Sequence, residues 1–302
     1  MSANPNSNSH SHTVIELKNL TKFYGKQRGI EDVSFSVFEG EIFGFIGPNG
    51  AGKSTTIRTL LALFEPTGGS AAIFGKDCVK KAAEIAQDVG YLPSEVAFYD
   101  NMKVKELLVY TAALYKKDCS AKINALCEQL NLDQKRKIAD LSFGNKKKVG
   151  IVAALLHSPR LIILDEPTAG LDPLVQQTFF NILAEENKRG ATIFFSSHIL
   201  SEVQRFCQRV AILKEGKLIS IAEIKELREN GYKKIAITAK SAIPAGHFRA
   251  GNVAQFKQEG ASASFIYKGD VDALFKEIAG IDIVDAFVEE PSLEEIFLHY
   301  YE

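Results

Sequence analysis

The segment GPNGAGKST occupies residues 47–55 and fits the pattern G-x-x-x-x-G-K-[S/T]. Its glycines let the backbone turn so that several N–H groups point into one concavity, and a helix that follows directly adds its N-terminal donors. Lys53 supplies a positive charge to terminal phosphates, and the Ser54 hydroxyl can ligate Mg²⁺. The sequence therefore predicts a phosphate loop that binds ATP or GTP. Its residues are Gly47, Pro48, Asn49, Gly50, Ala51, Gly52, Lys53, Ser54 and Thr55.

The chain around this loop has the strand before it and the helix after it that the pattern requires. Residues 41–46 (EIFGFI) form an apolar run short enough for a buried strand, and residues 53–63 carry apolar side chains at helical spacing. Strands that alternate with helices predict an α/β fold with a mostly parallel sheet. Further strands are expected at 13–17, 33–38, 161–164, 191–196, 210–213 and 217–220, and helices at 174–189 and from about 199.

A pair of acids follows the apolar run at residues 161–164 (LIIL). Ligand sites of α/β sheets lie at the carboxyl ends of strands, so these acids are expected beside the phosphate loop. We expect Asp165 to hold Mg²⁺, directly or through water, and Glu166 to orient or deprotonate an attacking water. An apolar strand that ends in two acids is a weak signal alone, and it gains meaning from the loop upstream.

Composition limits the possible partners. The 302 residues include 36 Lys and Arg against 37 Asp and Glu, for a net charge of −1, which argues against a general nucleic-acid binder. One of the longest apolar runs, Val149–Leu156, has eight residues, far short of the ~18 that a membrane helix needs. We therefore expect no nucleic-acid partner, and contact with a membrane only through another protein. Four cysteines without CxxC spacing are expected to be reduced and at least half-buried.

Four further segments follow one another in a recognisable order. Residues 141–145 read LSFGN, residues 169–172 read AGLD, Tyr24 lies in the sequence FYG, and His198 follows an apolar strand and two serines. Together with the phosphate loop and the two acids, this order and spacing resemble the nucleotide-binding subunits of ATP-binding cassette (ABC) transporters. The resemblance covers about residues 13–230 and implies the P-loop NTPase fold of such cassettes, a mostly parallel sheet with an antiparallel β part and a helical insertion.

The resemblance implies a role for each motif. LSFGN is similar to the family signature LSGGQ, in which Ser142 and Gly144 would contact ATP. Asp172 belongs to the segment that resembles the D-loop, His198 is similar to the switch histidine, and Tyr24 is similar to the aromatic residue that stacks on adenine. Taken alone, each has a plainer interpretation: Ser is a good N-cap, and the run of lysines at 146–148 is typical of a solvated face.

The resemblance also implies how such a chain works. Two cassettes would meet head to tail around two ATP molecules, with the signature helix of one copy pointing its positive N-terminus at the γ-phosphate held by the other. ATP would close the pair and hydrolysis would open it. We therefore expect an Mg²⁺-dependent ATPase and a homodimer. It would power a separate transmembrane permease in export, from the cytoplasmic face of the cell membrane.

Two motifs depart from the pattern of the family. Phe143 and Asn145 stand where the signature usually has Gly and Gln, which adds bulk beside the anion and shortens the amide side chain. Ser94 stands at the Q-loop position, where Gln is usual. Its side chain is too short for the same contact without an intervening water, and the adjacent Glu95 is the alternative.

The segment after the Q-loop, residues 95–102, resembles the surface that receives the membrane subunit. Phe98 and Tyr99 are candidate anchors there, since exposed aromatic residues favour interfaces. Local packing of the neighbouring helices is the alternative interpretation of both.

The chain divides into three segments. Residues 1–12, rich in Ser, Asn and His, are expected to be a disordered lead, and 13–230 to be the nucleotide-binding domain with a helical insertion at about 95–155. Residues 231–302 are expected to form a small α+β accessory domain, whose closing residues 291–297 resemble the C-terminal extension of export cassettes. In this domain we expect strands at 233–239, 263–267 and 281–288, and helices at 271–278 and 292–300.

Two other functions fit the same motifs. A soluble ABC ATPase acting on ribosomes or DNA usually has two cassettes or a long coiled coil, and this chain has one phosphate loop and no sustained heptads. A hydrolysis-poor regulatory cassette is favoured by Ser94 and Phe143. It is opposed by the presence of the predicted site residues Lys53, Asp165, Glu166 and His198.

Overall fold

The computed structural model describes residues 12–229, 232–243 and 253–290. The chain forms two compact units, one of Met1–His198 with Phe206–Ile221, the other of Ile199–Arg205 with Ala222–Glu302. The expected lead at 1–12 (apart from residue 12), the helix expected at 292–300 and the segment 291–297 lie outside the described residues.

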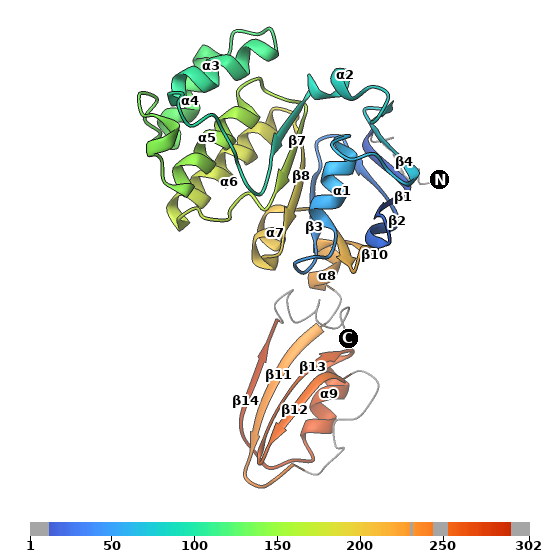
Figure 1. Ribbon diagram of the computed structural model, residues 1–302. Coiled ribbons are helices and arrows are strands. Elements are labelled where there is room, and N and C mark those ends of the chain that lie inside the picture. Colours follow the sequence, from blue (N-terminus) through green and yellow to red (C-terminus); the bar gives the residue numbers. More distant parts are fainter. Residues whose placement is uncertain (1–11, 230–231, 244–252, 291–302) are drawn as a thin grey trace, which may run out of the picture. The chain divides into compact units, whose positions relative to one another are not determined.

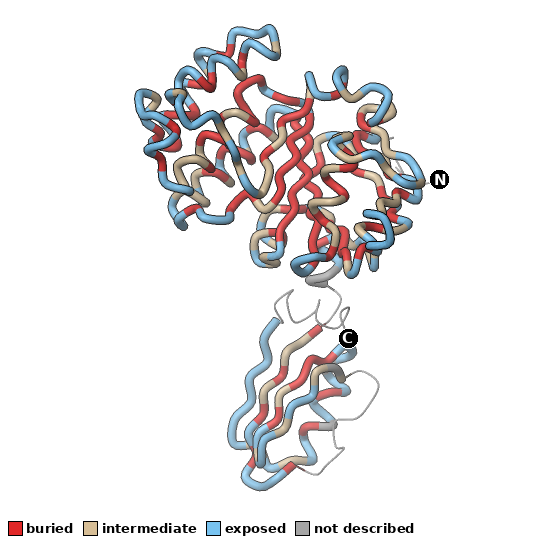
Figure 2. Tube along the Cα trace, in the orientation of Figure 1, coloured by how far each residue is buried: buried red, intermediate tan, exposed pale blue. Residues whose placement is uncertain are grey.

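The first unit is built on a six-stranded sheet, seen in Figure 1, with strands in the order β10-β9-β3-β8-β7-β6. Strand β3 pairs in parallel with β8 and β9, and β7 pairs in parallel with β6 and β8. This confirms the predicted α/β fold with a mostly parallel sheet. Figure 2 shows that the central strands are buried, and strands covered on both faces read as near-continuous apolar runs. The bounds are β3 Ile42–Ile46, β6 Val89–Leu92, β7 Leu161–Asp165, β8 Thr192–Ser197, β9 Arg209–Lys214 and β10 Lys217–Glu223.

A second sheet supplies the predicted antiparallel part, in the order β2-β1-β4-β5. Strand β1 pairs antiparallel with both β2 and β4. It runs well beyond the predicted end at residue 17. The prediction stopped there because the strand is irregular at this point: its register shifts between Leu17 and Leu20, and Asn19 adopts φ +51°. That irregularity breaks the alternation by which a strand is recognised. The bounds are β1 Thr13–Tyr24, β2 Gln27–Phe38, β4 Gly68–Ile73 and β5 Lys76–Asp77.

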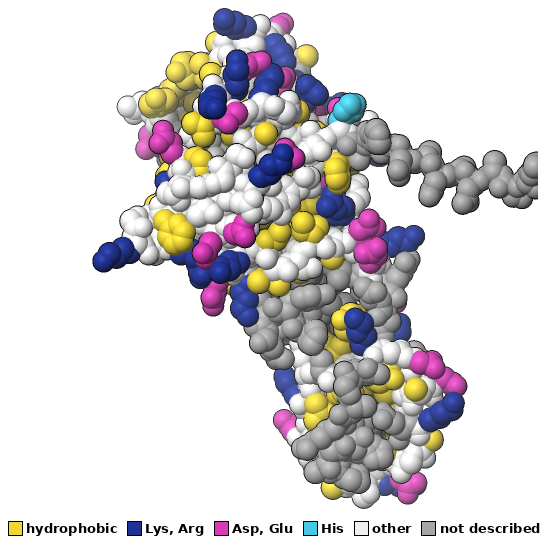
Figure 3. Space-filling view, turned by 90° about the vertical axis from the view of Figure 1, so that its right-hand side faces the viewer, with side chains coloured by type: hydrophobic (Ala, Val, Ile, Leu, Met, Phe, Trp, Pro, Cys, Tyr) yellow, Lys and Arg dark blue, Asp and Glu magenta, His cyan; other side chains and the backbone are white. Residues whose placement is uncertain are grey.

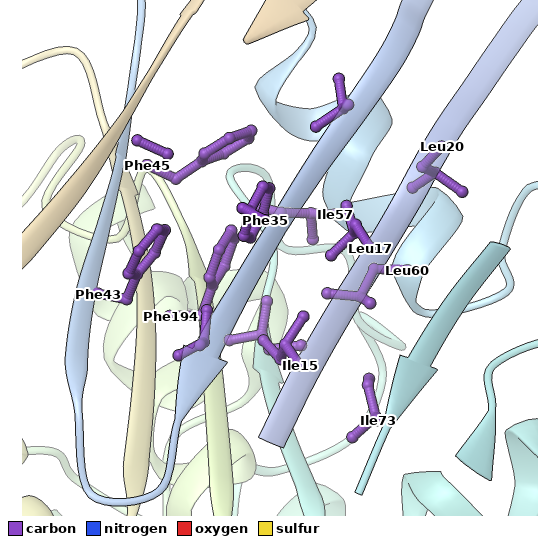
Figure 4. Close-up of a cluster of buried hydrophobic side chains, with 14 of the residues drawn as sticks. Ile15, Leu17, Leu20, Phe35, Phe43, Phe45, Ile57, Leu60, Ile73 and Phe194 are labelled. Carbon is purple, nitrogen blue, oxygen red and sulfur yellow. The ribbon is translucent and has the colours of Figure 1, made fainter. Parts of the chain in front are cut away.

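An aromatic cluster joins the two sheets (Figure 4). Phe35 of β2 stacks on Phe43 of β3 and on Phe194 of β8, with ring centroids 5.4 and 5.9 Å apart. Burying a phenylalanine side chain contributes about 1.5–3 kcal/mol, and each well-placed ring pair adds about 0.5–1.5 kcal/mol. The cluster fixes β3 and β8 relative to each other, and the candidate site begins at the ends of these strands.

Helices fill the chain between β6 and β7, as the prediction of a helical insertion at about 95–155 requires. Helix α6 begins at Pro173 because Asp172 caps it and proline suits the first helical position. The bounds are α1 Lys53–Leu60, α2 Ala82–Ala86, α3 Val104–Leu114, α4 Ser120–Gln129, α5 Phe143–Leu155 and α6 Pro173–Lys188, with a 3₁₀ turn at Ile138–Asp140.

The second unit contains a four-stranded sheet in the order β12-β13-β11-β14, with antiparallel pairing throughout. Helix α9 packs on it, because Leu274 and Ile278 share a core with Ile235, Ile237 and Phe265. Strand β12 was not predicted from the sequence, whereas the other three strands were. The bounds are α7 Leu200–Phe206, α8 Ile224–Glu229, β11 Tyr232–Ala239, β12 Val253–Glu259, β13 Ser262–Lys268, α9 Val271–Ile278 and β14 Ile283–Glu289.

Candidate functional site

The candidate site lies where three adjacent parallel strands end. In the register of the sheet, Ile46 at the end of β3 pairs with Ser197 of β8, and Asp165 at the end of β7 pairs with Ser196. The residues that follow these strand ends are Gly47, Glu166 and His198. Three segments far apart in the sequence therefore reach one edge of the sheet, the edge where α/β folds bind ligands.

The phosphate loop needs glycine at two positions for steric reasons. Gly52 is the N-cap of α1 and adopts φ +104°, and a Cβ there would lie 2.7 Å from Ile30 Cγ2. A Cβ on Gly47 would lie 2.3 Å from the carbonyl oxygen of Leu213. The loop is thus packed closely against its neighbours, and α1 begins directly behind it with free N-terminal N–H groups, the usual anion-binding geometry.

The Glu166 carboxylate connects the loop to His198. The Lys53 ammonium lies 3.2 Å from Glu166 Oε1 and donates to the carbonyl oxygen of Gly47 at 2.7 Å. The other carboxylate oxygen, Oε2, is hydrogen-bonded to His198 Nδ1. The side chain of Lys53 is 6% exposed and that of Glu166 17%, so the pair is shielded from water and its attraction is stronger than on a surface.

Asp165 lies beneath this group and is fully buried. Its Oδ1 accepts a hydrogen bond of 2.8 Å from Ser196 Oγ, while its Oδ2 has no hydrogen-bond partner among the described residues. A buried carboxylate oxygen without a partner is costly unless a cation or a water meets it. Oxygen atoms are the ligands that Mg²⁺ prefers, and β7 lies against α1, the helix that carries Ser54, so Asp165 together with Ser54 fits a magnesium site.

Lys53, Glu166 and His198 border a cavity of about 660 Å³. Eleven of the predicted site residues line it: Tyr24, Asn49, Gly50, Ala51, Gly52, Lys53, Ser54, Thr55, Ser94, Glu166 and His198. Gln27, Arg28 and Gly29, which the sequence did not indicate, line it as well, and so does Ala169 of the segment that resembles the D-loop. The first three residues lie at the start of β2, directly after the turn that follows Tyr24. Their residue types match no motif for phosphate or metal binding, so the sequence gave no reason to select them.

The signature residues lie outside this cavity. Ser142 caps α5, its hydroxyl accepting hydrogen bonds from the backbone N–H and the side-chain amide of Asn145 at 3.4 and 3.1 Å. The Phe143 ring is 54% exposed and covers Gly170, where a Cβ would lie 2.3 Å from the ring. A Cβ on Gly144 would lie 2.9 Å from the carbonyl oxygen of Gly170. The signature helix is therefore packed against the D-loop segment of its own chain.

Asp172 also lies outside the cavity. Its side chain accepts a hydrogen bond from the backbone N–H of Val175 at 3.0 Å, which makes it the N-cap of α6. Gly47, Pro48 and Asp165 are likewise absent from the cavity wall, and the carbonyl oxygens of the first two accept hydrogen bonds from Lys53.

One buried cation was overlooked in the sequence. Lys147, in the run read as a solvated face, is fully buried, and that interpretation is wrong at this position. Its ammonium donates to the carbonyl oxygens of Pro93, Ser94 and Glu166. Burial lowers the pKa of Lys147 to about 8, and the carboxylates of Asp165 and Glu166 oppose that shift. The groups that surround this ammonium come from segments distant in sequence, so no local pattern indicated its burial.

Known proteins resemble both the sequence and the fold. The ABC transporter family matches residues 30–169. The bacitracin transport ATP-binding protein BcrA of Bacillus licheniformis is 36% identical over 95% of this chain and 96% of its own. The linearmycin resistance ATP-binding protein LnrL of Bacillus subtilis is 30% identical over 95% of this chain and 97% of its own. A solved ATP-binding subunit of an ABC transporter shares 33% identity and a TM-score of 0.68, covering 72% of this chain and 92% of that chain.

With a phosphate loop at the carboxyl edge of a parallel sheet, these matches define the class of protein. The chain belongs to the family of ABC transporter ATP-binding proteins. The resemblance predicted from the order of GPNGAGKST, LSFGN and LIILDE is confirmed, and with it the assignment as an ATP-binding ATPase subunit linked to transport.

Proposed function

We propose that this chain hydrolyses ATP with Mg²⁺ at the cavity between the phosphate loop and His198, and that hydrolysis drives export through a separate membrane-spanning protein. The observation that carries the proposal is the meeting of Lys53, Glu166 and His198 at one sheet edge. Each of the three has a distinct chemical use in moving a phosphoryl group to water.

The phosphate loop would hold the nucleotide. Backbone N–H groups of residues 50–55 surround the phosphates, and Lys53 supplies the positive charge that terminal phosphates attract. Tyr24, 42% exposed at the cavity wall, offers a ring face for the base. Its hydroxyl lies 3.4 Å from Thr55 Oγ1, which orients the ring beside the start of α1.

Ser54 and Asp165 are the residues that would hold Mg²⁺. The unpartnered Oδ2 of Asp165 supports this assignment. A bound Mg²⁺ neutralises the charge that develops on the phosphates during transfer.

Glu166 and His198 would act on the water. A carboxylate next to the terminal phosphate can orient a water molecule and accept its proton. The contact with His198 Nδ1 fixes the direction in which this carboxylate points. Glu166 adopts φ +48°, an unfavourable conformation for a side-chain-bearing residue, which a structure tolerates where its surroundings hold it firmly.

A second copy of the chain would complete the site. Ser142 and Gly144 lie at the N-terminus of α5, an end suited to an anion, yet they line no part of the cavity of their own chain. With one phosphate loop and one signature per chain, a head-to-tail pair is the arrangement that brings the two together. The predicted contact of Asp172 would lie in the same interface.

Exposed apolar side chains beside the nucleotide-binding core support a separate partner in the membrane. None of the helices in the described part of the chain combines the length and apolar character that crossing a membrane requires. Tyr99 is 68% exposed, and Val109, Tyr110 and Leu114 of α3 are each more than half exposed. Phe98 instead packs toward Gly150 of α5, so Tyr99 and α3 form the surface that we propose for the partner.

Export is the direction favoured by the relatives. One is named for bacitracin transport and another for linearmycin resistance, and a subunit that confers resistance suits a transporter that moves its cargo outward. Nucleic acid is not favoured, because Lys and Arg side chains are interspersed with Asp and Glu on the face shown in Figure 3, and the net charge is −1.

Replacing Lys53 by alanine tests the phosphate loop. We expect Lys53→Ala to bind ATP about 10- to 100-fold more weakly, since a hydrogen bond to a charged partner is worth about 1.5–3 kcal/mol. Binding of a fluorescent ATP analogue to the purified protein measures this. Lys80→Ala, which removes an exposed lysine outside the cavity, is the matched control. Equal affinity in both variants would remove Lys53 from the site.

Replacing Glu166 by glutamine tests the chemistry separately from binding. Glu166→Gln keeps the shape of the side chain and removes its basicity, so ATP affinity should persist while hydrolysis falls by about 100-fold or more. Steady-state phosphate release gives the rate, and the persistence of bound ATP confirms occupancy. Turnover at the wild-type rate would mean that Glu166 takes no part in the reaction.

Purification from native membranes tests the partner. A tagged chain, solubilised in mild detergent, should bring down a multi-span membrane protein in near-equal amount, and Tyr99→Ala should reduce the yield. Leu63→Ala, 58% exposed in the wild type, serves as the control for loss of an exposed apolar side chain. Recovery of ribosomes or DNA-associated proteins instead would favour the soluble ATPase.

A further inference from the structure

Lys147 makes an unusual set of contacts for a lysine in the interior of a protein. It lies in the second turn of α5 and is fully buried. Its ammonium group has three N–H donors, and three carbonyl oxygens receive them, from Pro93 at 3.0 Å, Ser94 at 2.8 Å and Glu166 at 3.3 Å. Every donor is used, which is the condition under which a buried charge is tolerated.

The three acceptors belong to two segments that border the cavity. Pro93 and Ser94 follow the end of β6, and Glu166 follows the end of β7. Ser94 and Glu166 both line the cavity, and their carbonyl oxygens accept hydrogen bonds from Lys147. One ammonium group therefore links the backbones of the segments that follow β6 and β7, and both segments border the proposed ATP site.

Glu166 depends on such support more than its neighbours do. Its backbone adopts φ +48°, a conformation that residues with a Cβ atom rarely adopt. Its N–H is held by the carbonyl oxygen and the hydroxyl of Ser196, at 3.2 and 3.3 Å. Its carbonyl oxygen is held by Lys147. The two anchors sit on opposite sides of the residue and together fix the direction in which the carboxylate leaves the backbone.

We propose that Lys147 is a positioning residue for hydrolysis, which acts by fixing the Glu166 backbone against the Ser94 loop so that the carboxylate points at the reacting water. The inference rests on the proposed function, ATP hydrolysis at this cavity. Because Lys147 is fully buried and does not line the cavity, it would not contact the nucleotide, and its loss should alter the rate of the bound complex rather than the affinity for ATP. The carboxylates of Asp165 and Glu166 compensate its charge.

Steady-state kinetics of the full chain with ATP and Mg²⁺ test this. In Lys147→Met, which keeps the length of the side chain and removes its donors, kcat should fall about 10- to 100-fold, as misplacement by about 1 Å can cost 100-fold. KM should stay close to the wild-type value. Lys147→Arg, which retains donors, should recover part of kcat. Lys146→Met is the matched control, because Lys146 pairs with Asp100 at the surface, and both constants should remain near wild type.

Each other outcome overturns the inference. An unchanged kcat in Lys147→Met, a rise in KM that accounts for the whole loss, or equal losses in Lys147→Met and Lys147→Arg would each exclude a positioning role through hydrogen bonds. Thermal melting checks that the variants fold. Should Lys147→Met not fold, Lys147→Gln, with two donors and a shorter reach, should show an intermediate kcat at wild-type KM, and wild-type kcat in that variant refutes the role.

Different results would refute ATP hydrolysis at this cavity and the positioning role of Lys147. Glu166→Gln gives the background from contaminating ATPases. A wild-type rate no higher than this background would refute ATP hydrolysis and the role of Lys147 with it. A wild-type rate above the background, equalled by Lys147→Met, would refute only the role of Lys147.

Discussion

The register of three parallel strands is the constraint on which the whole site depends. Because β3, β8 and β7 run in the same direction and pair without a shift, their last residues fall at one edge, and the next residue of each chain segment is Gly47, His198 or Glu166. A slip of one residue would turn Asp165 to the opposite face of the sheet. The packing of Phe35, Phe43 and Phe194 across the strands stabilises this register.

The charges at that edge are arranged around Glu166. Its carboxylate meets Lys53 on one side and His198 on the other, and its carbonyl oxygen meets Lys147 behind. Two buried cations thus balance the two acids that end β7, which keeps the site close to neutral before a nucleotide brings its own charge. The same arrangement explains how a run of three lysines can supply one member to the interior.

Much of this could be predicted from the sequence, because the decisive segments are local. A strand, a glycine-rich loop and a helix occupy adjacent residues at 41–63, and an apolar run ends in Asp165 and Glu166, so pattern and spacing sufficed for the fold and for most of the cavity wall. Strand β1 was cut short because Asn19 interrupts its alternation. Lys147 and Arg28 were missed because their surroundings come from segments distant in sequence, which no local pattern records.

A single chain does not bring all the proposed ATP-binding residues together, since Ser142 and Gly144 line no part of the cavity that Lys53 lines. Mixing two defective copies tests this most directly. A Lys53→Ala copy retains an intact Ser142, and a Ser142→Arg copy retains an intact Lys53, so a mixed pair would contain one complete site. We predict that the mixture hydrolyses ATP well above the rate of either variant alone. A mixture no faster than the average of its components would contradict a site shared between two copies.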